Sequence, residues 1–343
     1  MSKQRVAVIG CGSIAKYRHL LEYDAHPEVE IVAVCDIVPE RAEDVAEQYQ
    51  AKAYTDYQTL LKEVDLDAVS VCLPNYLHAP VSIAALEAGC HVLCEKPMAT
   101  SYEEAQAMIR AAERSGKKLM IGHNQRFVAS HQKAKELIAS GAVGKIYSFR
   151  TAFGHGGPEG WSADGKSSWF FKKEQAFIGA MGDLGVHKAD LIRYLLDEEF
   201  TDVSAIVATN AKDFATVDDN AVCLLKSESG IIGTLTASWA YKAGEDNATV
   251  IYGEKAVLRL EDDPDYSLIV NYTDGATVKY ELGKIQSNEA GGQTTSHVIN
   301  HFIDAIQLDQ QPSITGEEGL RSLQIILAAL ESSETGKHVK IAQ

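Results

Sequence analysis

Three side chains of this sequence have the chemistry needed to oxidise an alcohol. Lys96 stands in the tripeptide Glu95-Lys96-Pro97, and Asp183 and His187 lie four residues apart further along. Oxidation of an alcohol requires a base for the hydroxyl proton as hydride leaves the carbon. A free histidine titrates near about pH 6.5 and a free lysine near about pH 10.4, so His187 is the better acid/base at neutral pH. We expect Lys96 to donate to the substrate oxygen and Asp183 to orient the substrate or His187.

A glycine-rich segment near the N-terminus is typical of a dinucleotide-binding turn. Gly10, Gly12 and Ala15 occupy the small positions of G-x-G-x-x-G/A, with Ser13 and Ile14 between them. The spacing alone is a weak signal, but a strand pattern precedes it and a helix pattern follows it. Such a loop lets a pyrophosphate approach a helix N-terminus. A glycine turn in a nucleotide-free domain is the alternative.

Asp36 ends the second strand-like run of the sequence. A carboxylate at that place accepts hydrogen bonds from the adenosine ribose and repels a 2′-phosphate, so it favours NAD over NADP. Ile37 and Val38 follow it, and Arg41 falls within the next helix pattern. We therefore expect no basic residue beside Asp36.

A parallel sheet is needed to bring these strand ends together. Apolar strand-like runs alternate with helical patterns between residues 5 and 122, which predicts a doubly wound Rossmann domain over residues 1–123. The expected strands are residues 5–9, 30–35, 68–73, 91–94 and 118–121. The expected helices are residues 39–49, 79–88 and 101–115, the last opening on a capping box at Ser101 and Glu104.

The pattern changes after residue 123 and predicts an α+β domain over residues 124–343. A helix over about residues 128–140 precedes strand-like runs separated by turns, which indicate a large, mainly antiparallel open sheet. These runs are residues 146–153, 221–226, 231–240, 249–252, 256–260 and 267–272. Helical spacing over residues 183–197 places Asp183 and His187 on one face. The alternative is a helix-capping aspartate with a surface histidine. A last helix, over 317–335, is expected at the domain junction.

The composition excludes several classes of protein. The 343 residues include 32 basic and 48 acidic ones, and the net charge of -16 disfavours broad binding to nucleic acid or anionic membranes. No apolar stretch approaches the roughly 18 residues of a membrane helix, and no signal-peptide pattern precedes the first strand. We expect a cytoplasmic protein. The six cysteines form no CxxC pair, so we expect neither a disulfide framework nor a metal site.

Four motifs in this order resemble the Gfo/Idh/MocA family, which includes glucose-fructose oxidoreductase and inositol dehydrogenase. They are the loop of residues 10–15, Leu73-Pro74-Asn75-Tyr76-Leu77-His78, Glu95-Lys96-Pro97, and Gly179-Ala180-Met181-Gly182-Asp183-Leu184-Gly185-Val186-His187. The resemblance spans nearly the whole chain. It implies an NAD-binding Rossmann domain, a second domain built on an open sheet, and assembly into a homodimer or homotetramer.

The resemblance also implies roles for single residues. The cofactor would be lined by Leu73, Pro74, Asn75 and His78, its nicotinamide ribose would meet Glu95, and Trp169 would approach the nicotinamide. The Lys96–Pro97 bond is often cis in this family. A solvated ion pair of Glu95 and Lys96 is the alternative interpretation.

The sequence gives weaker evidence for the residues that contact the substrate. The weaker candidates on the substrate side are Asn124, Arg126, Trp161 and Tyr241. Phe170 stands where the family often has arginine, so the identity of the substrate stays open.

These observations favour an NAD-dependent dehydrogenase that oxidises a secondary hydroxyl of a sugar, a cyclitol such as inositol, or a sugar derivative. Two alternatives remain. One is an enzyme that uses tightly bound NAD transiently during elimination or group exchange. The other is a catalytically silent NAD-binding regulator, because a fold alone does not establish activity.

Overall fold

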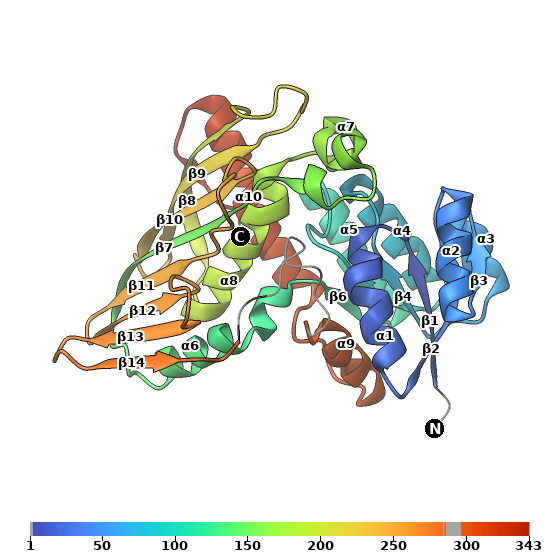
Figure 1. The fold of residues 1–343 in the computed structure, drawn as a ribbon, viewed down its shortest axis with the longest axis horizontal. Coiled ribbons are helices and arrows are strands. Elements are labelled where there is room, and N and C mark those ends of the chain that lie inside the picture. The colour runs from blue at the N-terminus through green and yellow to red at the C-terminus, as the bar shows by residue number, and fades with distance from the viewer. Residues whose placement is uncertain (1–2, 284, 286–295, 343) are drawn as a thin grey trace. The chain divides into compact units, whose positions relative to one another are not determined.

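The computed structural model describes residues 3–283, 285 and 296–342, which form two compact units (Figure 1). Unit 1 comprises the described residues of 1–123, 161–169 and 286–320, and unit 2 comprises the remainder. Two segments from the sequence range 124–343 therefore cluster with the N-terminal part of the chain.

Unit 1 is built on a six-stranded parallel sheet in the order β3-β2-β1-β4-β5-β6. Its strands are β1 (Gln4–Ile9), β2 (Val29–Cys35), β3 (Lys52–Tyr54), β4 (Ala68–Val71), β5 (His91–Cys94) and β6 (Leu119–Ile121). All residues of β4 and β6 are buried, as expected for strands covered on both faces. The doubly wound Rossmann fold is confirmed.

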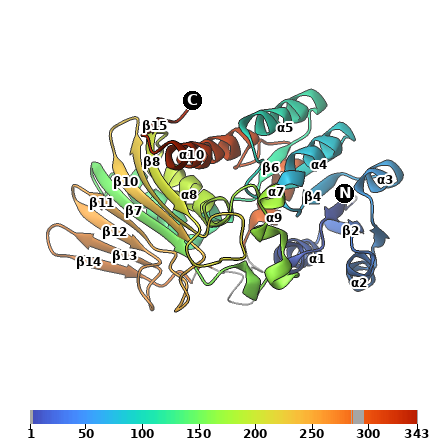
Figure 2. The ribbon, with the colours of Figure 1, turned by 90° about the horizontal axis from the view of Figure 1, so that it is seen from above.

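Helices cover both faces of this sheet (Figure 2). Figure 2 shows α4 (Asn75–Glu87) and α5 (Tyr102–Ser115) on one side, and α1 (Leu20–Ala25) and α2 (Pro39–Tyr49) on the other. Unit 1 also contains a π-helical turn η1 (Ala15–His19), α3 (Tyr57–Glu63), a 3-10 turn η4 (Gly165–Ser167) and α9 (Val298–Gln307). Helix α5 begins where Ser101 accepts a hydrogen bond from the Glu104 amide at 3.2 Å, and it ends at Gly116 with φ 65°. These caps match the expected ends of that helix.

Unit 2 is built on a nine-stranded sheet in the order β14-β13-β12-β11-β7-β10-β9-β8-β15. Its strands are β7 (Ile146–Gly154), β8 (Phe200–Ala208), β9 (Asn220–Ser227), β10 (Ile232–Ser238), β11 (Thr249–Gly253), β12 (Ala256–Leu260), β13 (Leu268–Tyr272), β14 (Thr277–Tyr280) and β15 (Val339–Lys340). Only β7 and β10 pair in parallel among the described strands of this sheet, with Leu235 opposite Thr151. The mainly antiparallel sheet is confirmed.

The helices of unit 2 lie against one face of its sheet, as Figures 1 and 2 both show. Those on that face are α6 (Ala129–Ala139), α8 (Val186–Leu196) and residues 321–335 of α10 (Gly316–Thr335). Unit 2 also contains η2 (Asn124–Phe127), α7 (Lys173–Ala176) and the π-helical turn η6 (Met181–Gly185). Two 3-10 turns, η3 (Pro158–Gly160) and η5 (Trp169–Phe171), lie in the connections. Burial alternates along β9, so every second side chain points to the other face of the sheet.

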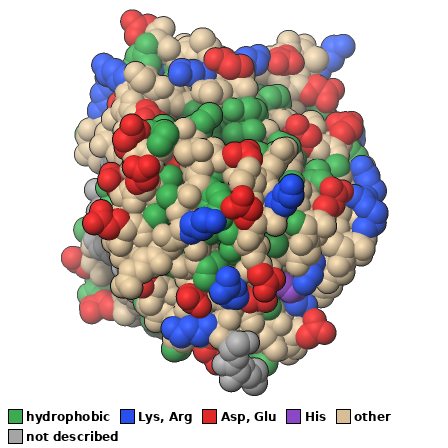
Figure 3. Space-filling model, turned by 90° about the vertical axis from the view of Figure 1, so that its right-hand side faces the viewer, with side chains coloured by type: hydrophobic (Ala, Val, Ile, Leu, Met, Phe, Trp, Pro, Cys, Tyr) green, Lys and Arg blue, Asp and Glu red, His purple; other side chains and the backbone are tan. Residues whose placement is uncertain are grey.

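Acidic and basic side chains are interspersed on the face of the molecule drawn in Figure 3. In the part of the chain that the structure describes, no helix is long and apolar enough to cross a membrane.

Candidate active site

The glycine loop after β1 has the geometry that a dinucleotide requires. Gly10 has φ 96°, and a Cβ there would lie 2.2 Å from the carbonyl oxygen of Cys72, so only glycine fits the turn. At Gly12 a Cβ would meet no atom within 4 Å, which leaves the backbone accessible to a ligand. The turn runs directly into η1 and α1. The residues present therefore fit the pyrophosphate of NAD.

Asp36 follows β2, and its carboxylate accepts hydrogen bonds from two backbone segments, the glycine loop and the residue before α2. Its Oδ2 accepts a hydrogen bond from the Cys11 amide at 2.9 Å, and its Oδ1 accepts one from the Val38 amide at 2.9 Å. Arg41 places Nη1 3.8 Å from the same Oδ2. The expectation that no basic residue lies beside Asp36 is thus wrong, because the first turn of α2 brings Arg41 back toward the strand end.

The segment after β4 is tied to the Glu95-Lys96-Pro97 tripeptide through His78. Its Nδ1 lies 2.7 Å from the Pro97 carbonyl oxygen, and its Nε2 lies 2.8 Å from that of Leu73. Burial lowers the pKa of His78, and hydrogen bonds to these two carbonyls oppose that shift. The Lys96–Pro97 peptide bond is cis. Pro74 precedes α4, and Asn75 is the first residue of that helix and is buried.

Glu95 is buried and belongs to a network that the sequence reasoning missed. Its Oε1 accepts hydrogen bonds from Arg18 at 2.9 Å and from His19 at 2.8 Å. The other ring nitrogen of His19 lies 3.0 Å from the Ser70 hydroxyl. Burial alone would raise the pKa of Glu95, but Arg18 and His19 outweigh it and the pKa is lowered. Glu95 is therefore an anchored carboxylate, not half of a solvated pair with Lys96.

Gly122, directly after β6, packs closely against the Glu95 carboxylate. A Cβ at Gly122 would lie 3.1 Å from Oε1 of Glu95. The next residue of the tripeptide, Lys96, is half-buried in unit 1. Its backbone amide donates to Oε2 of Glu95 at 3.3 Å, which fixes the start of its side chain.

Asp183 and His187 are both buried in unit 2, at the junction of η6 and α8. Oδ2 of Asp183 accepts a hydrogen bond from the Trp239 indole at 3.1 Å. Neither helical segment has a side-chain cap, so the structure does not support the alternative of a capping aspartate with a surface histidine. Phe170 and Phe171 pack edge-on against Trp239 and thereby fix the donor.

The turn that enters η6 is held by Asp218. Its carboxylate accepts hydrogen bonds from the amides of Gly179 at 2.7 Å and Met181 at 2.8 Å, and its carbonyl oxygen accepts one from Ala180 at 3.0 Å. A Cβ at Gly179 would lie 1.9 Å from that carbonyl oxygen. Burial raises the pKa of Asp218 to about 6, although the two amide donors oppose the shift.

Lys188 is a second residue that the motif reasoning missed. It is fully buried, and its Nζ donates to the Asn247 carbonyl oxygen at 2.8 Å. The same Nζ lies 5.8 Å from the centre of the Phe153 ring, and that ring lies 5.8 Å from the His187 ring. Burial lowers the pKa of Lys188 to about 7, despite carboxylates in the surroundings. No local signal marked Lys188, because His187, Asp190 and Arg193 lie in the same helix.

The four weaker substrate candidates have different surroundings. Arg126 is buried and bonds both oxygens of Asp190, at 2.6 and 2.7 Å, which favours a structural role for its guanidinium. Asn124 is also buried, in the first turn after unit 1. Tyr241 is partly exposed and packs on Gly154, where a Cβ would lie 2.3 Å from the ring.

Trp161 and Trp169 bound the short segment that belongs to unit 1. The Trp161 carbonyl oxygen accepts a hydrogen bond from Ser13 of the glycine loop at 2.9 Å. Trp169 begins η5 and is half-buried. Lys96 thus belongs to unit 1 together with the cofactor-loop residues, whereas Asp183 and His187 belong to unit 2.

Among the residues described, no group of three or more histidine, cysteine or acidic side chains could hold a metal ion. All six cysteines are free thiols and buried. Burial raises the pKa of the Cys11 thiol to about 12 and that of the Cys90 thiol to about 11.

Comparisons with known proteins identify the family. Residues 4–123 match the oxidoreductase family with an NAD-binding Rossmann fold, and residues 131–259 match the GFO/IDH/MocA C-terminal domain. The chain is 31% identical to D-glucoside 3-dehydrogenase of Escherichia coli (strain K12), over 99% of this chain and 98% of that protein. It is 26% identical to myo-inositol 2-dehydrogenase of Thermotoga maritima, over 99% of each.

A solved structure of levoglucosan dehydrogenase in complex with NADH and levoglucosan superposes with a TM-score of 0.86. It is 28% identical and is covered, like this chain, over its full length. The glycine loop, the two-unit fold and these relatives lead to one conclusion: the chain belongs to the Gfo/Idh/MocA family of NAD-binding sugar and cyclitol dehydrogenases.

Proposed function

We propose that the protein is an NAD-dependent dehydrogenase that oxidises a secondary hydroxyl of a sugar, a cyclitol or a sugar derivative, with His187 as acid/base. The observation that supports this most is the buried arrangement at the start of α8, where Asp183 is fixed by Trp239 and His187 follows it by four residues. Relatives named as glucoside and inositol dehydrogenases support the substrate class.

Each residue has one role in this proposal. His187 takes the proton of the substrate hydroxyl and returns it in the reverse direction. Lys96 donates a hydrogen bond to the same oxygen and stabilises the developing alkoxide. Asp183 orients the substrate or the His187 ring. NAD, when bound, supplies the hydride acceptor.

The cofactor residues are also part of the proposal. We assign the pyrophosphate to the loop of Gly10, Gly12, Ser13 and Ile14, and the adenosine ribose to Asp36. The nicotinamide half is assigned to Glu95 and Trp169, with the segment of Leu73, Pro74, Asn75 and His78 beside it. The enzyme is expected to prefer NAD.

A spectrophotometric screen of glucosides, inositols and anhydrosugars with NAD tests the activity. Net NADH production supports a dehydrogenase. Product formation without net NADH would instead indicate transient use of bound NAD, and tight NAD binding without any turnover would indicate a silent regulator.

Alanine variants test the roles. Lys96→Ala and His187→Ala are each expected to lower kcat by about 10²–10⁴-fold while NAD affinity stays within a few-fold. His26→Ala, on a half-buried histidine in the turn after α1, is the matched control. Because residues that act in one step are not additive, the double variant should lose far less than the product of the two single losses. Multiplicative losses would refute a shared step.

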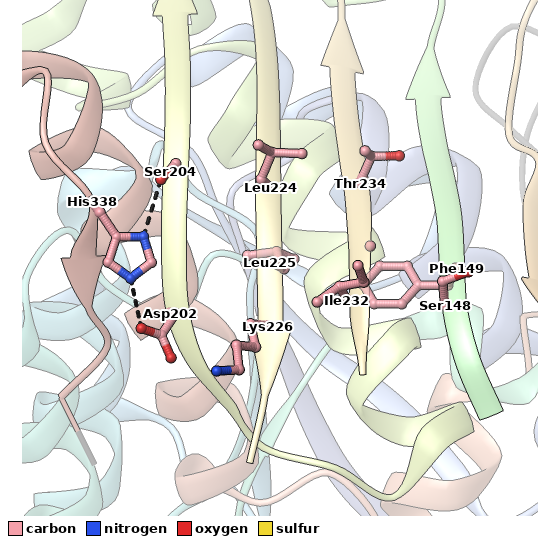
Figure 4. A pocket seen from close by; sticks show the side chains of 11 residues that line it. Ser148, Phe149, Asp202, Ser204, Leu224, Leu225, Lys226, Ile232, Thr234 and His338 are labelled. Carbon is pink, nitrogen blue, oxygen red and sulfur yellow. Dashed lines mark hydrogen bonds and ion pairs between the residues drawn. The ribbon is translucent and has the colours of Figure 1, made fainter. Parts of the chain in front are cut away.

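We also propose that the protein forms a homodimer or homotetramer through the open face of the unit 2 sheet. Ile206, Val222, Leu224 and Ile232 expose their side chains there. Figure 4 shows Leu224 and Ile232 on adjacent strands, beside a His338 ring that bonds Asp202 and Ser204. An apolar sheet face of this kind marks an interaction surface.

Sedimentation of a Leu224→Arg variant tests this assembly. The side chain of Leu224 is 60% exposed and that of Leu308 is 63% exposed, so Leu308→Arg in unit 1 is a matched control. A charge at Leu224 is expected to dissociate the oligomer and one at Leu308 to leave it intact. A wild-type monomer at assay concentration would refute the proposal.

A further inference from the structure

The Trp161–Trp169 segment contacts two parts of the candidate cofactor site within unit 1, the pyrophosphate loop and the region beside Asp36. Ser13 of the glycine loop donates to the Trp161 carbonyl oxygen at 2.9 Å. Beside Asp36, Nη2 of Arg41 donates to Oδ1 of Asp164 at 2.8 Å. A segment far away in sequence thus contacts the loop assigned to the pyrophosphate and the helix beside Asp36.

Arg41 lies between two carboxylates. Its Nη1 is 3.8 Å from Asp36, and its Nη2 is 2.8 Å from Asp164. The Arg41 side chain is 22% exposed and that of Asp164 is 45% exposed, so a dinucleotide and solvent have access to this cluster. The net charge of the cluster is negative, since one guanidinium faces two carboxylates.

Because Asp36 is assigned to the adenosine ribose, this cluster would face the 2′ position of a bound dinucleotide. Arginine binds phosphate through a planar fork of donors, so an unoccupied Arg41 would be a suitable partner for NADP. Asp164 accepts a hydrogen bond from the Arg41 guanidinium and so occupies one of these donors. It also adds a negative charge that would repel a phosphate dianion. NAD presents only hydroxyl groups at this position and does not meet this repulsion.

We propose that Asp164 is a specificity-determining residue: by engaging Arg41 it favours NAD over NADP. The inference rests on the proposed role of Asp36 as the ribose acceptor. Asp36 alone disfavours a phosphate, and Asp164 strengthens that preference by neutralising the cation beside it.

Titration calorimetry of the substrate-free protein with NAD and with NADP tests the proposal without any turnover. Asp164→Asn is expected to tighten NADP binding by about tenfold, as one charge-assisted hydrogen bond becomes available, and to change NAD binding by less than about threefold. The double variant Arg41→Ala/Asp164→Asn is expected to lose the gain for NADP.

Two further variants separate charge from attachment. Ser13→Ala removes a hydrogen bond to the same segment without changing a charge. Because Ser13 is also assigned to the pyrophosphate loop, the affinities for NAD and NADP are expected to fall together and their ratio to stay as in the wild type. Glu87→Gln breaks an exposed pair with Arg114, 3.3 Å apart in the same unit, and serves as the charge control.

Each of three results would overturn the inference. NADP affinity could be unchanged in Asp164→Asn, or the gain in NADP affinity could be equally large in the double variant or in Ser13→Ala. Wild-type protein that binds NAD but oxidises no sugar would refute the proposed function while this binding test still holds. Wild-type protein that binds neither dinucleotide would overturn both.

Discussion

The buried ammonium of Lys188 yields a prediction about the pH dependence of stability. The pKa of Lys188 falls from 10.5 to about 7 because the fully buried side chain loses hydration. The unfolded chain therefore holds this proton more tightly than the folded protein. Stability rises with pH wherever the unfolded state binds more protons, so wild-type stability should increase from about pH 7 toward pH 10.5.

The magnitude follows from the two pKa values. The fall of the Lys188 pKa from 10.5 to about 7 corresponds to a loss of about 5 kcal/mol in the free energy of unfolding below pH 7. Between about pH 6 and pH 9 the free energy of unfolding of the wild type should rise by about 3 kcal/mol, because the folded protein releases the Lys188 proton over this range. Lys188→Met keeps most of the length of the unbranched side chain and removes the titration. Loss of the bond to the Asn247 carbonyl adds a cost that does not vary with pH.

Urea unfolding of both proteins at pH 6 and pH 9 measures the difference. The free energy of unfolding of Lys188→Met, relative to wild type, should fall by about 3 kcal/mol between the two pH values. Lys133→Met, on a partly exposed lysine of α6, is the control and should follow the wild type. Parallel pH profiles for wild type and Lys188→Met would refute the reasoning, whatever the absolute stabilities.

Other substitutions test the local geometry. Gly10→Ala should destabilise the protein by about 1–3 kcal/mol, because the methyl group would meet a carbonyl oxygen at 2.2 Å. Gly12→Ala should keep the melting temperature and weaken NAD binding; equal melting temperatures for the two would contradict this. Glu95→Gln removes the charge opposite buried Arg18 and should cost about 3–5 kcal/mol, seen as a lower urea midpoint. Trp239→Phe should lower kcat by about tenfold without changing NAD affinity, and wild-type kcat would rule out its orienting role.

The sequence predicted the elements whose signals are local. Helix α2 was expected over residues 39–49 and has these ends, because Pro39 favours a first helical position. Helix α4 was expected over 79–88 but begins at Asn75, since Pro80 inside it masked the earlier turn. The strand β3 has three residues, too few for a periodic pattern, and was not expected. The fold class was predicted from the alternation of strands and helices, and this alternation does not depend on the exact ends of a helix or on one short strand.

The candidate site was predictable as a set of motifs but not as a set of contacts. The bond from Arg18 to Glu95 joins residues 77 apart, and that from Arg41 to Asp164 joins residues 123 apart. Neither pair has a local signature, because each depends on how distant strands and turns pack. For the same reason, Trp161–Trp169 was assigned to the second domain by its place in the sequence, while its contacts assign it to unit 1.

Two of the four motifs are associated with a π-helical turn: the glycine loop runs into η1, and η6 lies within the motif of residues 179–187. A π turn accommodates one residue more than an α turn, so it offsets the faces of the helix on its two sides. Deleting a single residue from such a turn would restore an α-helix and rotate everything before it by about 100°. Asp183 stands inside η6 and His187 inside α8. The relative direction of these two side chains thus depends on the length of one turn, so a one-residue indel could reset it in a single evolutionary step without any substitution at either residue.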